Sequence, residues 1–183
     1  MENYFSTEEL KLIGFNSFGE NVKISKKASI YNAINISIAS NVRIDDFCIL
    51  SGKIQIGHYI HIAPYSSLTG GTEGIFLHDF VGISRKVEIF ACSDDFSGKF
   101  MTNPTVPEKY TNVINAKVVL KKHVIIGCGS VVLPNVILEE GTAIGAMSLV
   151  KKSTEAWGMY FGIPCKRIGQ RKKDLLQFEK YLK

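Results

Sequence analysis

Large apolar residues recur at every sixth position over most of the chain. Four positions after most of them stands a small or β-branched residue, so each hexad offers two side chains that can face inward. Apart from a two-residue slip after Ile30, the series is interrupted twice. Its large members are Phe18, Ile24, Ile30, Ile38, Ile44, Leu50, Ile56, Ile62, Leu68, Leu77, Ile83, Ile89, Leu120, Ile126, Val132, Leu138, Ile144 and Val150.

A period of six excludes a helix as the repeating unit, because at 3.6 residues per turn the apolar positions would move round the helix surface. Short strands joined by tight corners can follow it, and turn formers often come after the large apolar residue, as in IGHY, IGCG and LPNV. Three hexads then make one triangular coil. The sequence predicts an all-β fold, a parallel β-helix of about six coils stacked at roughly 4.8 Å.

The two ends of such a prism expose strand edges, and the terminal segments are expected to cover them. Residues 1–17 are predicted to form a helical cap, since Ser6 and Glu9 have the spacing of a capping box and Gly14 suits a helix stop. Residues 18–155 carry the repeat. Residues 156–183 form a basic segment that is expected to end in an amphipathic helix over RKKDLLQFEKYL, within a single domain spanning residues 1–183.

The two interruptions are a Gly-rich bulge, TGGTEG at residues 69–74, and a loop at residues 93–112. A loop of that length in a compact domain is usually functional or disordered. This one carries Phe96, Phe100, Met101 and Tyr110. We therefore expect it to protrude and to pack against something outside its own prism, such as another subunit.

The net charge of +5 is concentrated in the tail. Residues 151–183 hold 9 Lys/Arg against 3 Asp/Glu, whereas residues 1–150 are close to neutral. Such a tail suits nucleic acid, a membrane surface, a phosphorylated small molecule or solvent, and no nucleic-acid motif accompanies it.

No apolar run reaches the roughly 18 residues of a membrane helix, and no CxxC pair is present. We expect a cytoplasmic protein without membrane insertion whose cysteines are reduced.

The hexads, the segment VVLKKHVIIGCGSVVLPNVILEEGTAIGAMSLVKKS and the closing GIPCKRI resemble the left-handed β-helix acyltransferases of the hexapeptide-repeat family. The resemblance covers nearly the whole chain, and it alone implies the left-handed coil, since the general crossover rule favours the right hand. It also implies acetyl-CoA as cosubstrate, no metal, and a homotrimer with active sites between subunits. The cofactor-binding residues that it implies are Gly127, Gly145, Ala146 and Ser148 along the pantetheine arm, and Lys151, Lys166 and Arg167 at the phosphates.

The sequence departs from the maltose- and galactoside-type O-acetyltransferases at the start of the long loop. Those enzymes have a THP segment whose histidine deprotonates a sugar hydroxyl, whereas this chain has Cys92, Ser93, Asp94 and Asp95. An ordinary aspartate, with a pKa near 3.9, is too weak a base for a hydroxyl. A free amine attacks a thioester unaided and needs only orientation, charge stabilisation and a late proton acceptor. Asp94 and Asp95 are therefore the candidate catalytic pair, and a turn or helix-cap pair is the structural alternative.

Within the family, the SDDFSG loop, the GGTEGI bulge and LKKHVIIGCGSVVLP are most similar to N-acetyltransferases that modify nucleotide-linked 4-amino-4,6-dideoxyhexoses for bacterial surface glycans such as O-antigen. This similarity implies a dTDP-linked amino sugar as the acceptor. Tyr65, Glu73 and Asp94 are the candidates for binding it. A backbone N–H near Cys128 and Gly129 is a candidate for binding the oxyanion.

Three other functions stay open from the sequence. His123, in the coil after the loop, is the candidate base if the acetyl group goes instead to a hydroxyl of a glycan or galactoside. A zinc carbonic anhydrase on the same repeat needs three histidines at coil spacing, and His58 and His61 are only three residues apart. A non-catalytic scaffold would not require the basic GIPCKRI ending.

Overall fold

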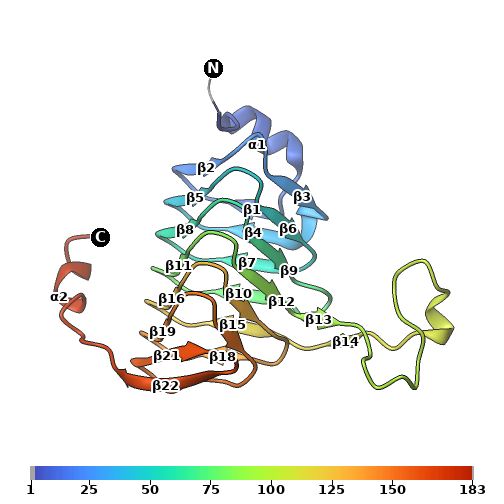
Figure 1. Cartoon of the computed structure of the whole chain (residues 1–183). Coiled ribbons are helices and arrows are strands. Elements are labelled where there is room, and N and C mark those ends of the chain that lie inside the picture. The colour runs from blue at the N-terminus through green and yellow to red at the C-terminus, as the bar shows by residue number, and fades with distance from the viewer. Residues whose placement is uncertain (1–2, 183) are drawn as a thin grey trace.

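The structure, a computed structural model, describes residues 3–182. The chain winds into a three-sided parallel β-helix in which each turn adds one strand to each of three sheets (Figure 1). Six complete coils are stacked, and β21 begins a seventh. The predicted architecture and coil number are confirmed.

The three sheets are named here in the order in which the chain visits them. Sheet I consists of β1 (Ser17–Phe18), β4 (Ile36–Ile38), β7 (Ile54–Ile56), β10 (Ile75–Leu77), β15 (Val118–Leu120) and β18 (Ile137–Leu138). Sheet II consists of β2 (Val22–Ile24), β5 (Val42–Ile44), β8 (Ile60–Ile62), β11 (Gly82–Ile83), β16 (Ile125–Ile126), β19 (Ala143–Ile144), β21 (Gly158–Gly162) and β22 (Cys165–Gln170). Sheet III consists of β3 (Ser29–Tyr31), β6 (Ile49–Ser51), β9 (Ser67–Thr69), β12 (Glu88–Phe90), β17 (Val131–Val132) and β20 (Leu149–Val150).

The corners between these sheets form three edges of the prism, the I–II, II–III and III–I edges. In the fourth coil, for example, residues 78–81 turn the I–II edge and residues 84–87 turn the II–III edge. Each corner is short, so residues at equivalent places in successive coils lie above one another. An edge is therefore a column of side chains drawn from distant parts of the sequence.

The hexad residues fill the interior. All the large apolar residues of the series are buried except Phe18 and Ile30, which are half-buried in the first coil. Burial of one such side chain contributes about 1.5–3 kcal/mol. The stacked rungs are thus the main source of stability.

Buried hydroxyl groups join successive coils at the II–III edge. Ser66 Oγ donates to the carbonyl oxygen of Ser84 at 2.9 Å and accepts from Val87 N, in the same coil as Ser84, at 3.2 Å. Ser130 Oγ repeats this pattern, donating to Gly145 O at 3.0 Å and accepting from Ser148 N at 3.2 Å. Since buried polar groups need partners, these serines serve the fold.

Bulky residues occupy corner positions with a left-handed backbone, a conformation that Gly and Asn adopt more readily. Phe47 has φ 61°, Tyr65 φ 64° and Phe80 φ 63°. That conformation costs an L-residue about 1–2 kcal/mol. The rings of Phe47 and Tyr65 stack at 5.0 Å, and those of Tyr59 and Phe80 at 5.1 Å. Such pairs contribute about 0.5–1.5 kcal/mol, which offsets part of the cost.

The N-terminal end is covered by helix α1 (Thr7–Ile13), as predicted (Figure 1). Both hydrogen bonds of the capping box are present, with Ser6 N donating to Glu9 Oε2 at 2.7 Å and Glu9 N donating to Ser6 Oγ at 3.2 Å. Gly14 ends the helix with φ 80°, and Leu10 is buried.

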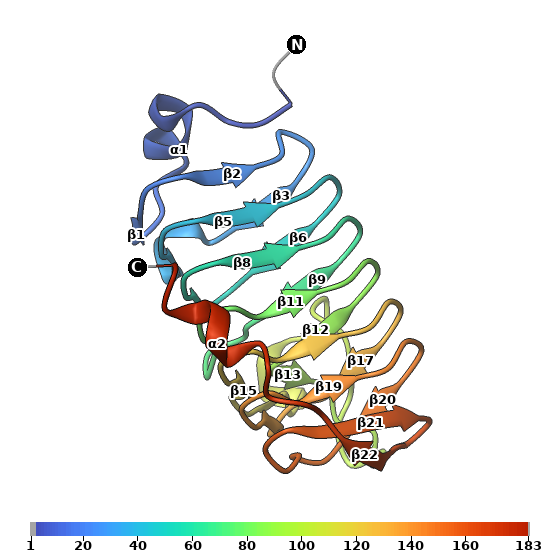
Figure 2. The ribbon, with the colours of Figure 1, turned by 90° about the vertical axis from the view of Figure 1, so that its left-hand side faces the viewer.

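The C-terminal end is covered by a hairpin. The antiparallel hairpin β21–β22 forms the last layer (Figure 2). The helix predicted within RKKDLLQFEKYL is present as the short α2 (Leu176–Glu179), but it lies along the side of the prism instead of covering the end, and it leaves Phe178 and Tyr181 exposed. Neither helix in residues 3–182 is long and apolar enough to cross a membrane.

The long loop leaves the prism at the III–I edge. The antiparallel pair β13 (Cys92–Ser93) and β14 (Ile114–Asn115) forms its base, and the rest projects away from the coils (Figure 1). A 3-10 helix, Glu108–Tyr110, lies within it. Its apolar residues are exposed, and Phe96 reaches 93%. The predicted protruding loop is confirmed.

Candidate functional site

The two aspartates at the start of the loop have different surroundings. Asp95 Oδ1 accepts from the backbone N–H and the hydroxyl of Ser97 at 2.6 and 2.5 Å, and Oδ2 accepts from Asn112 Nδ2 at 3.3 Å. The hydrogen bonds from Ser97 lower the pKa of Asp95. Asp94 is half-buried, and within residues 3–182 its carboxylate has no hydrogen-bond partner. Asp95 therefore shapes the loop, whereas Asp94 is free to meet a ligand.

The Gly-rich bulge packs against the base of the loop. Thr72 N donates to Asn115 Oδ1 at 3.2 Å, and a Cβ on Gly71 would lie 3.0 Å from Cys92 Cβ. The exposed Glu73 and the carboxylate of Asp94 thus belong to one edge, III–I. The third candidate for the sugar, Tyr65, lies on the II–III edge, on the far side of sheet III.

The II–III edge carries two hollows. The upper one lies nearer the N-terminal end of the prism and the lower one nearer the C-terminal end. The lower, of about 440 Å³, is lined by residues of coils three to five, among them His61, Gly82, Ser84, Ile125 and Cys128. The upper, of about 360 Å³, is lined by Tyr4, Arg43, Asp45, Phe47 and Tyr65. Arg85 lines both and forms no ion pair within residues 3–182.

Ser84 is a site residue that the sequence analysis missed. It opens the corner after β11 and lines the lower hollow. Its backbone N–H donates to Ile126 O at 3.0 Å, and its hydroxyl has no partner within the described residues. In the hexad pattern Ser84 directly follows the large apolar residue Ile83, which puts it at a corner, but nothing in the sequence distinguishes it from the other corner residues as part of a site.

The predicted pantetheine residues all lie on the II–III edge, and packing accounts for two of the glycines. A Cβ on Gly127 would lie 2.5 Å from Ala146 N, and one on Gly145 would lie 2.4 Å from the Phe161 ring. Both glycines therefore let successive layers approach each other. Ala146 itself is exposed.

Ser148 points into the prism rather than towards a groove. It is 2% exposed, and its hydroxyl accepts from Gly162 N at 3.1 Å and donates to Ala146 O at 3.5 Å. Its side chain fixes the turn of the β21–β22 hairpin, and only its neighbours face outward.

The predicted phosphate-binding residues share one hollow at the C-terminal end of the prism. This hollow has a volume of about 400 Å³ and lies between residues 151–155 and the β21–β22 hairpin. Arg167 Nε is 3.6 Å from the exposed carboxylate of Glu155. The hollow has three further cations that form no ion pair within residues 3–182, namely Lys151, Lys152 and Lys166. The uncompensated charge suits a polyanionic ligand.

His123 lies on a third edge, I–II, away from both groups described above. It is 7% exposed, its ring stacks on Phe80 at 5.0 Å, and Nε2 is 3.1 Å from Glu179 Oε2. The structure therefore does not bring His123 to Asp94. Its imidazole contacts the C-terminal segment instead.

His58 and His61 do not share a site. Ser40 N donates to His58 Nδ1 at 3.3 Å on the I–II edge, whereas His61 Nε2 is 2.7 Å from Asp45 Oδ2 on the outer face of sheet II. In residues 3–182 no group of three or more His, Cys, Asp or Glu side chains has the geometry to hold a metal ion.

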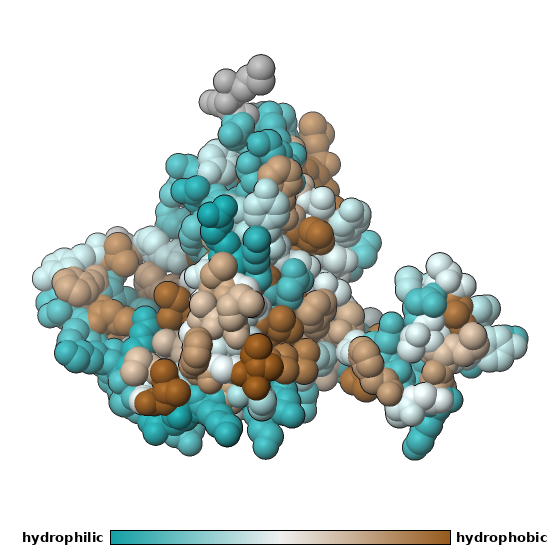
Figure 3. Space-filling view, in the orientation of Figure 1, coloured by the Kyte–Doolittle hydropathy of each residue, from teal (hydrophilic) through white to brown (hydrophobic). Residues whose placement is uncertain are grey.

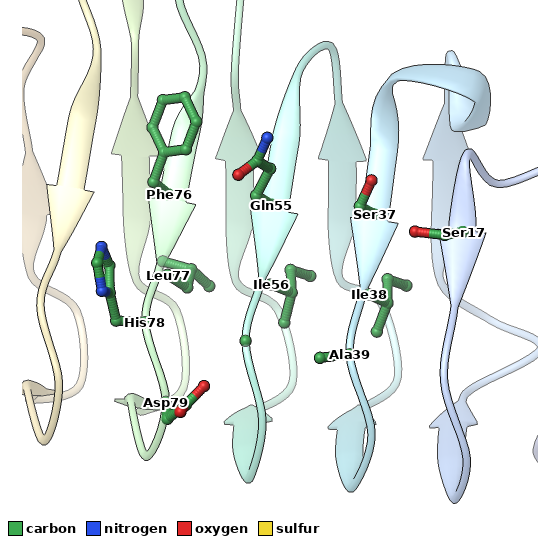
Figure 4. A pocket seen from close by; sticks show the side chains of 11 residues that line it. Ser17, Ser37, Ile38, Ala39, Gln55, Ile56, Phe76, Leu77, His78 and Asp79 are labelled. Carbon is green, nitrogen blue, oxygen red and sulfur yellow. The ribbon is translucent and has the colours of Figure 1, made fainter.

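A hollow of about 530 Å³ is a shallow depression on the outer face of sheet I. Ser17, Ser37, Gln55 and Phe76 project from four successive strands along it, with Asp79 at one end (Figure 4). Asp79 Oδ1 accepts from His58 N at 2.8 Å, so that carboxylate is already used. No candidate site residue lines this face, and we assign no chemistry to it.

The surface of the C-terminal coils carries apolar patches among polar residues. In the view of Figure 3, hydrophobic residues gather over the middle of the C-terminal half of the prism, and the projecting loop shows hydrophobic and hydrophilic residues mixed. Exposed apolar side chains of these coils include Ile125, Met147, Phe161 and Ile163. Apolar patches of this kind mark sites of contact with other molecules.

Comparisons with known proteins identify close relatives, although no protein-family model matches the chain. The chain is 52% identical over 183 residues to a dTDP-4-amino-4,6-dideoxy-D-glucose acyltransferase of Escherichia coli, with 98% of this chain and 95% of the relative covered. A candidate lipopolysaccharide biosynthesis O-acetyl transferase of E. coli K12, WbbJ, is 28% identical over 166 residues, with 86% and 80% covered.

Solved structures of AntD, an N-acyltransferase from Bacillus cereus, match the whole fold. The D94A variant bound to dTDP and coenzyme A has a TM-score of 0.96 and 53% identity, covering 100% of this chain and 98% of AntD. The S84A variant, bound to dTDP-4-amino-4,6-dideoxyglucose and coenzyme A, matches with the same score, identity and coverage. The match confirms the left-handed β-helix that the resemblance implied.

Proposed function

Because the chain belongs to the family of dTDP-4-amino-4,6-dideoxyglucose acyltransferases, we propose that it transfers an acetyl group from acetyl-CoA to the amine of a dTDP-linked 4-amino-4,6-dideoxy sugar. The E. coli relative is named for that acceptor, and AntD binds it together with coenzyme A. The observation that carries the proposal is Asp94, whose carboxylate is half-buried and unpartnered within residues 3–182. AntD has an aspartate at the same number, replaced in its D94A variant.

The proposed reaction is direct attack by the amine. The amine nitrogen forms a bond to the thioester carbonyl carbon, and the resulting tetrahedral intermediate carries an oxyanion and an ammonium. Asp94 orients the N–H, stabilises the cation and takes its proton. The C–S bond then breaks, the thiolate receives the proton, and the products are the N-acetylated sugar and coenzyme A. A carboxylate is a sufficient base here because the ammonium of the intermediate is far more acidic than a hydroxyl.

O-acetyl transfer is the less favoured reaction because the relative that is 52% identical is named for an amino-sugar acceptor, whereas the O-acetyl transferase match is only 28% identical. His123 lies on another edge and is covered by the C-terminal segment. Asp95, the second sequence candidate, is held by Ser97 and Asn112. We therefore assign the proton transfer to Asp94 alone.

We further infer that each active site takes residues from two subunits of a homotrimer. AntD was also crystallised as variants at a serine numbered 84, and this chain has Ser84 at that number. Ser84 and Asp94 lie on different edges, separated by the width of sheet III, on the order of 15 Å for residues 87–91 in extended conformation. A single amine cannot contact both residues of one chain. A neighbouring subunit that presents its loop to this II–III edge would bring the two together.

The surface supports such an assembly. The loop exposes Phe96, Phe100, Met101 and Tyr110, which find no cover within their own prism. The lower coils expose apolar residues as well (Figure 3). Head-to-tail contacts of this kind close into a ring when the rotation is threefold. Tyr65 and Glu73, which also lie on two edges, would meet one nucleotide sugar in the same way.

For the cosubstrate, we propose that the phosphates occupy the hollow with Lys151, Lys166 and Arg167. The pantetheine arm would then follow the II–III edge past Ala146 and Gly127 towards Ser84. Three coil spacings, about 14 Å, separate the last layer from the coil of Ser84, a distance suited to an extended arm. The cytoplasmic location and the surface-glycan destination of the product stay predictions.

The test is a thiol-release assay with acetyl-CoA. We compare dTDP-4-amino-4,6-dideoxyglucose with the same nucleotide sugar carrying a 4-hydroxyl group. Turnover of the amine alone is expected, and equal turnover of the hydroxyl sugar would overturn N-transfer. A parallel assay with 3-hydroxybutyryl-CoA, with which AntD was crystallised, checks the acyl group. Preference for that thioester would overturn acetyl as the natural group but not the amine acceptor.

A further inference from the structure

The C-terminal segment of residues 171–182, called the strap here, runs back along the side of the prism. It leaves the end of β22 and passes over the I–II edge, so that α2 lies beside coils that are far away in sequence (Figure 2). The edge beneath it is a column of rings. Tyr59 stacks on Phe80 at 5.1 Å, Phe80 on His123 at 5.0 Å, and His123 lies 6.2 Å from Trp157.

Arg171 fixes the start of the strap to three layers at once. Its Nη1 donates to His123 O at 2.7 Å and to Gly141 O at 3.1 Å. Its backbone N–H donates to Trp157 O at 2.7 Å. These three carbonyls belong to corners of successive coils on the I–II edge. Both side-chain bonds come from the one nitrogen Nη1, whose two N–H groups are held in the plane of the guanidinium.

The rest of the strap is held by a second set of contacts. Glu179 accepts from Lys122 Nζ and lies 3.1 Å from His123 Nε2, while Tyr59 Oη donates to Leu182 O at 2.8 Å. Lys173 Nζ lies 5.4 Å from the centroid of the Trp157 ring. These contacts hold the strap along its length, independently of Arg171.

The segment directly before Arg171 is the hairpin that carries the basic hollow. Strand β22 contributes Lys166 and Arg167. Only two register pairs, Ala143 with Met159 and Ile144 with Tyr160, attach β21 to the coil above, and β22 has no other neighbour in the sheet. The place of the hairpin therefore depends on its two ends. Ser148 holds the turn end through Gly162 N, and Arg171 holds the open end.

We propose that Arg171 is a positioning residue for acyl-CoA. By fixing the open end of the hairpin to the I–II edge, it holds Lys166 and Arg167 where they meet the phosphates of the cosubstrate. This inference rests on the proposed function, which puts those phosphates in the basic hollow. Arg171 does not itself line that hollow.

The test compares Arg171→Lys with a matched variant at the far end of the strap. Lysine keeps the charge, but its ammonium nitrogen lies one bond nearer the backbone than Nη1 and is not held in a plane, so it holds the two carbonyls less well. The KM for acetyl-CoA is expected to rise about tenfold, with kcat and the KM for the nucleotide sugar within about twofold. Tyr59→Phe removes the hydrogen bond to Leu182 and leaves Arg171 in place, and its KM for acetyl-CoA is expected to stay unchanged. Thermal unfolding of both variants confirms that the proteins compared are folded.

A double-mutant cycle separates positioning from a general structural effect. If Arg171 acts through Lys166 and Arg167, then adding Arg171→Lys to the Lys166→Ala, Arg167→Ala protein raises the KM for acetyl-CoA little further. A full additional tenfold rise, or a kcat loss without a KM change, would overturn the inference. If the Lys166→Ala, Arg167→Ala change leaves that KM unaltered, the proposed phosphate site fails first. If that change raises the KM but Arg171→Lys does not, only the role of Arg171 fails.

Discussion

Ser84 and Asp94 belong to consecutive segments of one coil yet lie on two different edges of the prism, with strand β12 between them. Ser84 faces a hollow on the II–III edge, and Asp94 begins the loop that leaves the III–I edge. The two residues are ten positions apart in the sequence, and this separation puts them at the two edges of the prism that flank sheet III. In the proposed trimer, each chain would present two half-sites, and two chains would be needed to complete a site.

Mixed trimers provide a direct test of this arrangement. Chains with Ser84→Ala and chains with Asp94→Asn are each expected to be nearly inactive alone. Randomly mixed trimers would contain one intact site wherever the two kinds of chain adjoin in the right order, which restores about a quarter of native activity. The measurement is the acetyl-transfer rate after co-expression, compared with each variant alone. No recovery would mean that both residues of a site come from one chain.

Replacing the two aspartates separately tests their different surroundings. Asp94→Asn is expected to lower kcat by about one to three orders of magnitude, because it removes the proton acceptor and the charge that stabilises the intermediate. Asp95→Asn keeps an oxygen that can accept from Ser97, and its effect on kcat is expected to stay below about fivefold. Steady-state kinetics with dTDP-4-amino-4,6-dideoxyglucose gives both numbers. Equal losses of kcat in the two variants would mean that Asp95 takes part in catalysis as well.

Lys166→Ala tests the place of the cosubstrate. Loss of one charge-assisted phosphate contact, worth about 1.4 kcal/mol, is expected to raise the KM for acetyl-CoA about tenfold and to leave the KM for the nucleotide sugar unchanged. Lys117→Ala, a lysine outside the hollow, is the control. A rise in the KM for the sugar instead would put the nucleotide, not coenzyme A, in this hollow.

Asp45 makes stability depend on pH. Burial alone would raise its pKa, but hydrogen bonds from His61 and Arg43 outweigh that effect, and the pKa is lowered. Arg43 Nε and His61 Nε2 lie 2.6 and 2.7 Å from the carboxylate, which is 8% exposed. Because the folded pKa lies below the unfolded value of about 3.9, the stabilisation is complete above that pH and is lost as the pH falls through the folded value.

Asp45→Asn should therefore lower the free energy of unfolding by about 1–2 kcal/mol at pH 7. The difference from the native chain should begin to shrink below the unfolded pKa of about 3.9 and continue to shrink as the pH falls through the lowered folded pKa. Urea unfolding at several pH values measures both. A difference that stays constant between pH 7 and pH 3 would show that the carboxylate's charge does not contribute.

The sequence determined the coils. The hexad period is a local property of strand and corner, so the inward residues, the number of coils, the capping box at Ser6 and the two interruptions could all be found without knowing what packs against what. The motifs and the family resemblance extended this to the acceptor class, and the comparisons agree.

Only the tertiary structure decided what each polar residue does. The hexad pattern puts Ser66 inward and Ser84 at a corner, but only the structure shows that the Ser66 hydroxyl bonds to the next coil and that Ser84 lines a hollow with no hydroxyl partner in residues 3–182. Asp94 and Asp95 are neighbours, yet within residues 3–182 only the carboxylate of Asp95 has hydrogen-bond partners. His123 is a candidate base from the sequence, yet in the structure its Nε2 lies beside the carboxylate of Glu179, a residue 56 positions away. A side chain's role depends on its neighbours in space, and in a β-helix those neighbours come from other coils, loops and termini that no local pattern specifies.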